Sequence, residues 1–398
     1  TLHSNFGPGI RLRNTVTNTL VRKNVIYENL YAGVQVQLRS AGIGVESTIS
    51  QNSIYNNTEI GIDISHDTTS GTPDQVTVND ANDSDTGPNL GLNFPQFTRA
   101  VYSGSDLILQ GCAPAGSTVE LFEADVSAGS TSGANAGDNS FGMSQDYGEG
   151  ETYLASFVEG VGEDTTLTLV DCTGLTDSDG NDATGMNSFQ WRMTLPSSLE
   201  IGDKLTATAT VSGTGTSEFS AVAIIAGQDY GDAPNEFGTT LSVDGARHDV
   251  TNDVYLGSVK PDVDSDGQPG VSANDDGADE DGVASLSVLT TSDRTYTVVV
   301  TATNAANDEA TLIGWIDFDG NGSFDADEAA IRTIPTGANG DSYTLKWSSI
   351  PLDIQAGDSY LRLRLTTDTL NNREPSGAKF DGEVEDYPIS ITIAGVTV

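Results

Sequence analysis

NVIYENLYAGVQV at residues 24–36 aligns with NSIYNNTEIGIDI at residues 52–64, at a spacing of 28 residues. In both copies, apolar and polar residues alternate in short runs, and Asn and Gly recur between the runs. An earlier copy is visible 24 residues before the first, where Asn5 and Gly9 match its second half. Alternation predicts strands with one buried face, and repeats of this length are typical of stacked β-coils. The sequence therefore predicts parallel β-helix coils over residues 1–65, with Asn ladders at the turns.

These coils resemble the right-handed parallel β-helix repeats of bacterial surface proteins and of polysaccharide-degrading enzymes. Because Thr1–Asn5 reads as the middle of a repeat, we expect the natural N-terminus and any secretion signal to lie upstream. The turn-rich residues 66–98 are predicted to be a cap and linker, since a solenoid must cover its last apolar coil. The candidates for this cover are Leu90, Leu92, Phe94 and Phe97.

Alternating segments return over residues 99–227 and predict an immunoglobulin-like β-sandwich. The segment YGEGETYL at 147–154 resembles modules that often follow β-helices in bacterial exoproteins. A low-complexity stretch at 127–137 predicts a flexible loop. The predicted strands cover residues 106–109, 118–122, 152–157, 166–170, 189–193 and 205–211.

The last part of the chain lies between two distinctive segments, DYGDAP at 229–234 and GEVEDYPI at 382–389. This pair closely resembles the GEVED domain, an all-β module near the C-termini of large secreted bacterial proteins. The resemblance implies architecture and an extracellular, cell-surface location, but no reaction. Residues 228–398 are thus expected to form a GEVED-like, calcium-binding β-sandwich. The predicted fold class is all-β: the end of a parallel β-helix followed by two β-sandwich domains.

The chain is strongly acidic, with 58 Asp and Glu residues against 17 Lys and Arg residues and a formal net charge of -41. This charge repels phosphate backbones and anionic membranes, so neither nucleic acid nor direct membrane insertion is expected. Repulsion of this size also destabilises a compact state unless cations neutralise part of it. The alternative is a solvated acidic surface suited to salty water, which explains scattered acids but not ordered spacings.

DFDGNGSFDADE at residues 317–328 has the ligand register of the twelve-position EF-hand calcium loop. Its flank at 311–317 reads as a strand, so a sensor that opens a helical groove is not expected. The alternative is an acidic turn that binds no cation firmly. The predicted ligands are the side chains of Asp317, Asp319 and Asn321, the Ser323 carbonyl, Asp325 directly or through water, and bidentate Glu328.

A second acidic stretch, with Asp262, Asp264 and Asp266, repeats the first half of this spacing, but Ala273 stands where the bidentate acid belongs. More acids follow at 275–281, so the stretch predicts either a second calcium site or a disordered acidic loop. Poorer matches, at 177–182 and 80–85, are predicted to be ordinary turns.

Cys112 and Cys172 are the only cysteines, too few for a disulfide framework and without zinc-ligand spacing. In an extracellular protein they predict one disulfide, with two buried thiols as the alternative.

Candidate catalytic groups are lacking. His3, His66 and His248 are far apart and belong to no nucleophile or zinc motif, so they are predicted to lie at the surface or in turns. Arg362 and Arg364 alternate with leucines and are predicted to lie on the solvent face of a strand. Trp191, Trp315 and Trp347 sit in strand patterns and are predicted to be core residues.

The sequence thus favours a non-catalytic adhesin or structural protein of the bacterial cell surface, stiffened by calcium. Its expected partner is a cell-surface glycan or protein, or further copies of itself in a filament. The apolar run 389–398 either adds a strand to a neighbour or completes its own domain. The alternative function is a carbohydrate-binding or polysaccharide-degrading β-helix exoprotein.

Overall fold

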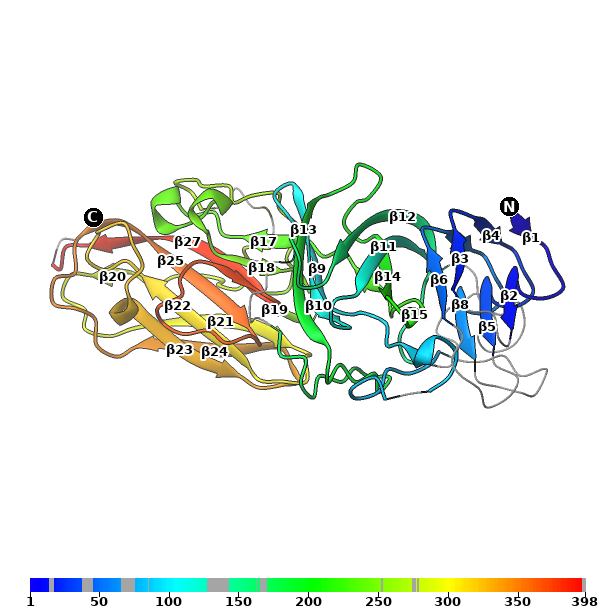
Figure 1. The fold of residues 1–398 in the computed structure, drawn as a ribbon. Coiled ribbons are helices and arrows are strands. Elements are labelled where there is room, and N and C mark those ends of the chain that lie inside the picture. Colours follow the sequence, from blue (N-terminus) through cyan, green and yellow to red (C-terminus); the bar gives the residue numbers. More distant parts are fainter. Residues whose placement is uncertain are drawn as a thin grey trace. The chain divides into compact units, whose positions relative to one another are not determined.

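The structure is a computed structural model that describes residues 1–13, 18–37, 46–65, 76–84, 86–126, 143–162, 164, 170–251, 253–273, 277 and 279–395. The part of the chain that these residues cover is all-β, and its helical elements are short 3-10 turns (Figure 1). The chain divides into two compact units. Unit 1 comprises Thr1–Ala100 and Ser105–Ile225, and unit 2 comprises Val101–Gly104 and Ala226–Val398. Across the described residues, no helix has the length and apolar character needed to cross a membrane.

Unit 1 begins with three small parallel sheets, which together we call the parallel ladder (residues 2–65; blue in Figure 1). Equivalent residues pair 24 or 28 positions apart, as in Ile10 with Val34 and Val34 with Ile62. The repeats in the sequence therefore correspond to strands that lie directly beside one another. The sheets are β1 (Leu2–His3), β4 (Val25–Tyr27) and β7 (Ser53–Tyr55); β2 (Ile10–Arg13), β5 (Val34–Gln37) and β8 (Ile62–Ser65); and β3 (Thr19–Arg22) with β6 (Ser47–Ser50).

Stacked amides and small turn residues hold the ladder together. Asn5 Nδ2 donates to Asn29 Oδ1 at 2.7 Å, and Asn29 Nδ2 donates to Asn57 Oδ1 at 2.8 Å. A Cβ at Gly33 would collide with the Ile54 side chain, so only glycine fits there. The predicted Asn ladder is therefore present in the structure, and the inward side chains, such as Ile54, form a buried apolar core.

Aromatic side chains of the following sandwich cover the last rung of this core. Phe122 and Phe219 belong to the same apolar cluster as the ladder and meet edge to face at 5.4 Å. The predicted cap is thus wrong for Leu90, which is 43 % exposed, and for Phe97, which packs on Phe189 in the sandwich. Phe94 packs against Ile60, next to the last strand of the ladder. The cover of the last rung therefore combines Phe94 from the predicted cap with Phe122 and Phe219, which lie far away in sequence.

The rest of unit 1 is a β-sandwich-like pair of antiparallel sheets. One sheet has the order β13-β10-β9, and the other has the order β12-β11-β14-β15 with β16 also on β14. The predicted strand at 166–170 and the loop at 127–137 lie outside the described residues, apart from Val170. The strands are β9 (Gln96–Ser103), β10 (Asp106–Ala113), β11 (Thr118–Asp125), β12 (Glu149–Val158), β13 (Asn187–Thr194), β14 (Lys204–Val211), β15 (Gly215–Thr216) and β16 (Ala223–Ile224), with a 3-10 turn η1 (Pro88–Gly91) before β9.

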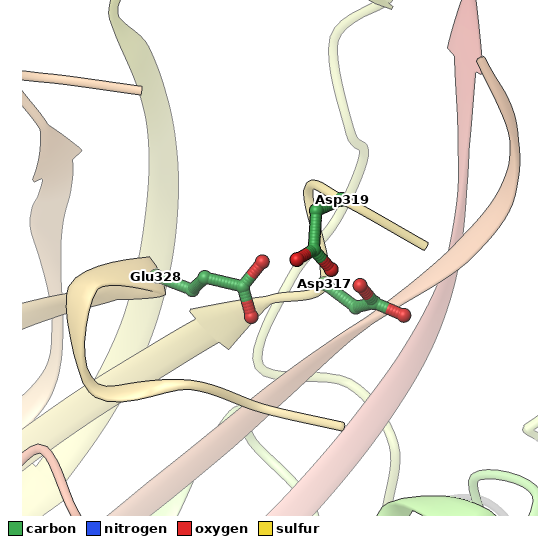
Figure 2. Close-up of side chains that lie close together, drawn as sticks. All are labelled: Asp317, Asp319 and Glu328. Atoms are coloured by element: carbon green, nitrogen blue, oxygen red, sulfur yellow. The ribbon is translucent and has the colours of Figure 1, made fainter. Parts of the chain in front are cut away.

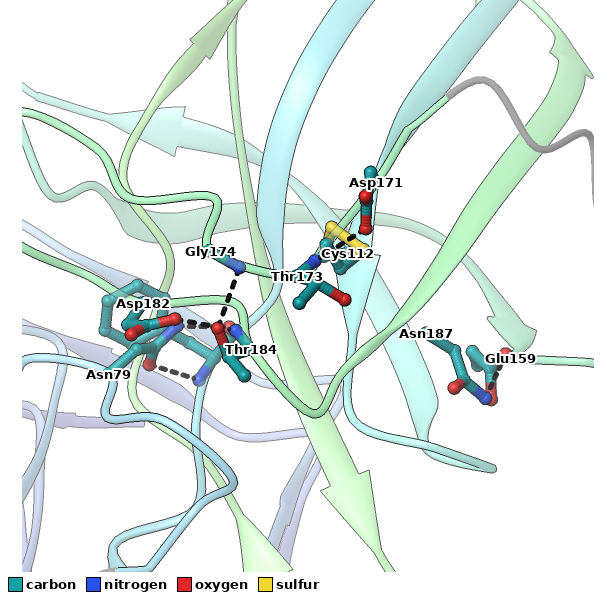
Figure 3. Close-up of a disulfide and its surroundings, with 11 residues drawn as sticks. Asn79, Cys112, Glu159, Asp171, Thr173, Gly174, Asp182, Thr184 and Asn187 are labelled. Carbon is teal, nitrogen blue, oxygen red and sulfur yellow. Dashed lines mark hydrogen bonds between the residues drawn. A yellow bond between two sulfur atoms is a disulfide. The ribbon is translucent and has the colours of Figure 1, made fainter.

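A disulfide joins Cys112, at the end of β10, to Cys172 in the connection that precedes β13 (Figure 3). Hydrogen bonds fold the connection back on itself next to the bridge. Thr173 N donates to Asp171 Oδ1, and Gly174 N donates to Thr184 Oγ1, both at 2.9 Å. The bridge therefore ties a long irregular segment to a core strand.

Unit 2 packs a five-stranded sheet, β20-β27-β25-β22-β23, against a three-stranded sheet, β19-β21-β24. A third small sheet, β17-β18-β26, completes the unit. The run 389–392 belongs to β27, inside the five-stranded sheet, and residues 396–398 lie outside the described part. The elements are β17 (Gln228–Tyr230), η2 (Asn235–Phe237), η3 (Leu241–Val243), β18 (Arg247–Asp249), β19 (Val254–Leu256), β20 (Leu289–Thr290), β21 (Tyr296–Asn304), β22 (Ala310–Ile316), η4 (Ala326–Glu328), β23 (Ala329–Ile334), β24 (Ala338–Trp347), β25 (Gly357–Thr366), β26 (Ala378–Lys379) and β27 (Glu383–Thr392).

The outer face of β25 is covered by other parts of unit 2, not by solvent. Arg362 and Arg364 are both fully buried, so the predicted solvent face is wrong. His248 is also buried and not at the surface: its Nε2 accepts from Arg364 Nε at 3.0 Å, and its Nδ1 donates to the Asp381 carbonyl. His66 lies outside the described residues, and His3 is exposed. All three tryptophans are buried.

Candidate metal centre

The loop Asp317–Glu328 connects two adjacent antiparallel strands, β22 and β23. Gly320 and Gly322 have φ angles of 68° and 81°, which glycine adopts without strain, and they let the chain turn sharply. Asp325 and Glu328 then form a capping box at the short turn η4. The calcium-loop register therefore sits on a β-hairpin, without the helix pair of an EF-hand.

Asp317 is held at the start of the loop by its own backbone neighbours. Its Oδ1 accepts from Gly320 N at 2.8 Å, and its Oδ2 accepts from Gly322 N at 3.0 Å. Its carbonyl accepts from Ser359 Oγ of β25 at 2.6 Å. The carboxylate is buried and oriented by the fold.

Glu328 closes the loop from the other end. Its Oε1 accepts from Phe318 N at 2.6 Å, and its Oε2 accepts from Asp325 N at 2.9 Å. The Trp347 indole donates to its carbonyl at 2.6 Å. The bidentate ligand of the predicted register is therefore fixed against the sandwich core.

Asp317, Asp319 and Glu328 bring carboxylate oxygens within 4.8 Å of one another (Figure 2). Burial, together with the charges of Asp317 and Asp319, raises the pKa of Glu328 to about 7, and burial also raises the pKa of Asp317. None of the ion pairs found among the described residues involves these three acids. The arrangement suits a hard cation with oxygen ligands.

The remaining predicted ligands are close but not all turned inward. Asn321 Nδ2 donates to Asp325 Oδ2 at 2.9 Å and to Asp319 Oδ2 at 3.2 Å. Its Oδ1 accepts from Ser323 N at 2.8 Å. A cation at this position needs the amide oxygen of Asn321, so the amide must rotate. With that rotation, the residues present fit calcium.

The two signature segments of unit 2 meet at a buried ion pair. Arg362 Nε and Nη2 donate to Asp386 Oδ1 and Oδ2 at 2.8 and 2.7 Å, and both side chains are fully buried. Asp386 Oδ2 also accepts from Ala233 N at 2.8 Å. Residues 229–234 and 382–389 are therefore parts of one constellation. Residues 311–390 match the GEVED domain.

This match confirms the resemblance for residues 311–390, which contain the Asp317–Glu328 loop, Arg362 and Asp386. Residues 229–310 lie outside the match. The matched residues thus include β23, β24 and β25 and most of β22 and β27, so they contribute to both large sheets of unit 2.

Solved structures with partial similarity include the BSP domain of a biofilm associated protein (11% identity, 77% of this chain and 31% of that chain, TM-score 0.16). Red sea bream transglutaminase (9%, 75% and 31%, 0.20) and CBD12 from CALX1.2 (9%, 73% and 96%, 0.18) are also similar. The chain spans 31% of the length of the first two. At these TM-scores, the similarities carry no argument.

Two acids of the second acidic stretch accept hydrogen bonds from different partners. Asp266 Oδ1 accepts from Leu241 N at 2.6 Å, whereas Asp264 Oδ1 accepts from Gln268 Nε2 at 2.9 Å. Within the described part of the chain, one group of acids has ligand atoms close enough to hold a metal ion, namely Asp317, Asp319 and Glu328. Asp262, Asp264 and Asp266 do not belong to it. Asp275 and Asp276 lie outside the described residues. The poorer match at 177–182 contains an ordinary turn, in which Gly180 N donates to the Asp177 carbonyl at 3.1 Å.

Sequence reasoning missed a buried group of acids in which Asp229 meets Glu383 and Glu385 of the GEVED domain. Burial and mutual repulsion raise the pKa of Asp229 and of Glu383, and burial raises the pKa of Glu385 to about 8. Each acid accepts a backbone N–H, as in Val384 N to Asp229 Oδ2 at 2.7 Å and Gly282 N to Glu385 Oε1 at 2.8 Å.

Proposed function

We propose that the chain is an extracellular, cell-surface β-protein of structural or adhesive type whose GEVED domain is stabilised by calcium. One observation carries the proposal: three buried or half-buried carboxylates converge in a loop that has the register of a calcium site. When bound, calcium supplies the positive charge that these acids lack. Asp317 and Glu328 hold the two ends of the loop, so occupancy joins β22 to β23 and opposes local opening.

We also propose that the parallel ladder is the end of a right-handed parallel β-helix, a stalk that carries the sandwich domains. The pairing of residues 24 and 28 positions apart and the stacked asparagines support it. A cell-surface glycan or protein, or copies of the chain, are the proposed partners. Strand β25 pairs with β27 from Glu383 to Ile391, and β20 pairs with its other edge at Ile391 and Thr392, so assembly through the end of that strand is disfavoured.

The calcium proposal is tested by titrating the full chain with calcium chloride in a calorimeter. Asp317→Asn should abolish binding at the loop, because it removes a buried ligand that both ends of the register require. Asp327→Asn is the matched control: it removes the same charge from the same loop at an exposed position outside the ligand register.

Melting of unit 2 provides a second measurement. At free calcium about 100 times Kd, binding adds about 2.7 kcal/mol to the free energy of unfolding. For a unit of this size, that amounts to a rise of about 5–11 °C in the melting temperature. Equal melting curves in calcium and in excess EDTA would remove the proposed function.

A further inference from the structure

Phe324 lies inside the calcium loop but points away from the acids, into the body of unit 2. It occupies the position between two predicted ligands, Ser323 and Asp325, and it is only 6 % exposed. Its ring packs against Phe237 of η2, with ring centroids 4.8 Å apart. The loop therefore touches a segment that lies about eighty residues earlier in the sequence and outside the GEVED match.

We call this segment, residues 231–240, the strap. Arg362 holds it through several acceptors: its Nη1 donates to the carbonyls of Phe237 and Gly238 at 2.8 and 2.9 Å, and its Nη2 donates to Thr239 Oγ1 at 3.2 Å. The guanidinium carbon also lies 5.3 Å from the centroid of the Phe324 ring. Phe324 and the strap are thus both in contact with the buried guanidinium of Arg362.

The strap also carries a charge to the loop. Glu236 is exposed, and a Cβ added at Gly322 would lie 3.8 Å from its Cδ. Without a cation, the acids of the loop repel Glu236 and oppose docking of the strap. A divalent cation in the loop reverses the sign of this interaction.

We propose that calcium in the Asp317–Glu328 loop clamps the strap onto the GEVED domain, with Phe324 as the contact that transmits occupancy. The proposal rests on the proposed calcium site and adds a consequence for a different segment. By thermodynamic linkage, the strap must then strengthen calcium binding by the same factor by which calcium strengthens strap docking.

Hydrogen exchange of the full chain, measured by mass spectrometry in excess calcium and in excess EDTA, tests the clamp. The reporters are Phe237 N and Gly238 N, which donate to the carbonyls of Pro234 and Asn235. In the unmodified chain, calcium should slow their exchange at least tenfold. In Phe324→Ala, the calcium-induced slowing of exchange should fall below twofold. Calcium affinity should weaken by the same factor by which this slowing decreases.

Two more variants keep the test decisive. Phe324→Leu replaces the alanine variant if exchange in β25 shows that the latter fails to fold. Glu236→Gln changes an exposed side chain and should stabilise the docked strap in EDTA, because it removes the repulsion from the loop acids. The calcium-induced slowing of hydrogen exchange should therefore become smaller. Asp327→Asn should leave this slowing at the value of the unmodified chain.

The outcomes separate the two proposals. If calcium binds the unmodified chain but strap exchange is the same with calcium and with EDTA, the clamp is wrong and the calcium site stands. The clamp is equally wrong if Phe324→Ala keeps the full slowing. If calcium does not bind at all, the proposed function and the clamp fall together.

Discussion

Asp386→Asn should destabilise unit 2 severely, because it breaks a fully buried ion pair. Asp386 accepts two hydrogen bonds from Arg362 and one from Ala233 N, and no other carboxylate contacts Arg362 among the described residues. Asparagine keeps the shape but leaves the guanidinium uncompensated and turns an amide N–H2 toward a donor. Breaking a buried pair in this way costs about 3–5 kcal/mol.

The assay is urea unfolding of the full chain, followed by pulsed hydrogen exchange of β25 and β27 peptides, which report on unit 2 alone. A loss of about 3–5 kcal/mol corresponds to a fall of roughly 6–20 °C in the melting temperature of a unit of this size. Asp358→Asn is the control on β25, the strand of Arg362: its side chain is exposed, and we expect a change within about 0.5 kcal/mol.

A double variant, Arg362→Met with Asp386→Leu, separates charge from packing. Removing both charges should recover most of the loss. A deficit of about 1–3 kcal/mol should remain, because the carbonyls of Phe237 and Gly238 lose their donor. If Asp386→Asn alone costs less than about 1 kcal/mol, the ion pair is not what joins the two signature segments, and the reasoning is refuted.

Three further predictions concern other buried features. Burial raises the pKa of Glu149 to about 8, above its ordinary value of 4.5, so unit 1 should lose stability as the pH rises from about 4.5 to 8, by up to ~5 kcal/mol. Glu149→Gln should flatten this dependence in denaturant titrations at several pH values, and an unchanged slope would contradict it. The Cys112–Cys172 disulfide closes a separation of 60 residues, so its reduction should lower the free energy of unfolding of unit 1 by about 4 kcal/mol in the same titrations. A Cys112→Ser/Cys172→Ser variant as stable as the oxidised chain would contradict this. Gly382→Ala should cost unit 2 roughly 3 kcal/mol or more, since φ is 98° and a Cβ would overlap the Leu365 carbonyl oxygen; a melting temperature equal to that of the unmodified chain would refute the clash.

The parallel ladder shows what a sequence reveals when contacts repeat at a fixed spacing. Ile26 pairs with Ile54 and Asn29 bonds to Asn57 because both pairs are 28 residues apart. Each rung carries the same pattern as the next, so pairing can be predicted from alignment of the chain with itself. The part of the cover that comes from Phe122 and Phe219 has no such signal, since Phe122 lies on β11 and Phe219 lies in the connection between β15 and β16.

The face of β25 shows why alternation alone misleads. Alternating leucines correctly predict which residues enter the sandwich core, and the arginines do point to the opposite side. Alternation does not say what lies on that side. Here the strap, about 120 residues earlier, covers Arg362 and provides the acceptors that make its burial tolerable.

The candidate metal centre was predictable for a similar reason. Its possible ligands are contiguous, so the register from Asp317 to Glu328 contains most of the geometry. In the second stretch, Asp264 and Asp266 accept hydrogen bonds from different partners, and Asp275 and Asp276 lie outside the described residues, so a second calcium site stays a prediction. The buried group around Asp229 and Glu383 joins segments more than 150 residues apart, which no local spacing can reveal.

The buried acids of unit 1 differ from those of the calcium loop in what they face. The last rung of the parallel ladder leaves a row of backbone N–H groups without a following strand, and such groups need acceptors. Carboxylates of the sandwich supply them: Glu120 accepts from Gln51 N, Asp125 from Asn56 N and Glu149 from Asn57 N, each at 2.8 Å.

These acids are thus held by oriented backbone donors, and none of them is part of the cation loop. The calcium dependence of stability should therefore be confined to unit 2, and chelation should leave hydrogen exchange in β11 and β12 unchanged while it accelerates exchange in β22 and β23. If chelation accelerates hydrogen exchange equally in both units, the acidity of the chain acts as a diffuse charge. The distinction between carboxylates that accept from the last rung of the parallel ladder and carboxylates that bind calcium is then wrong.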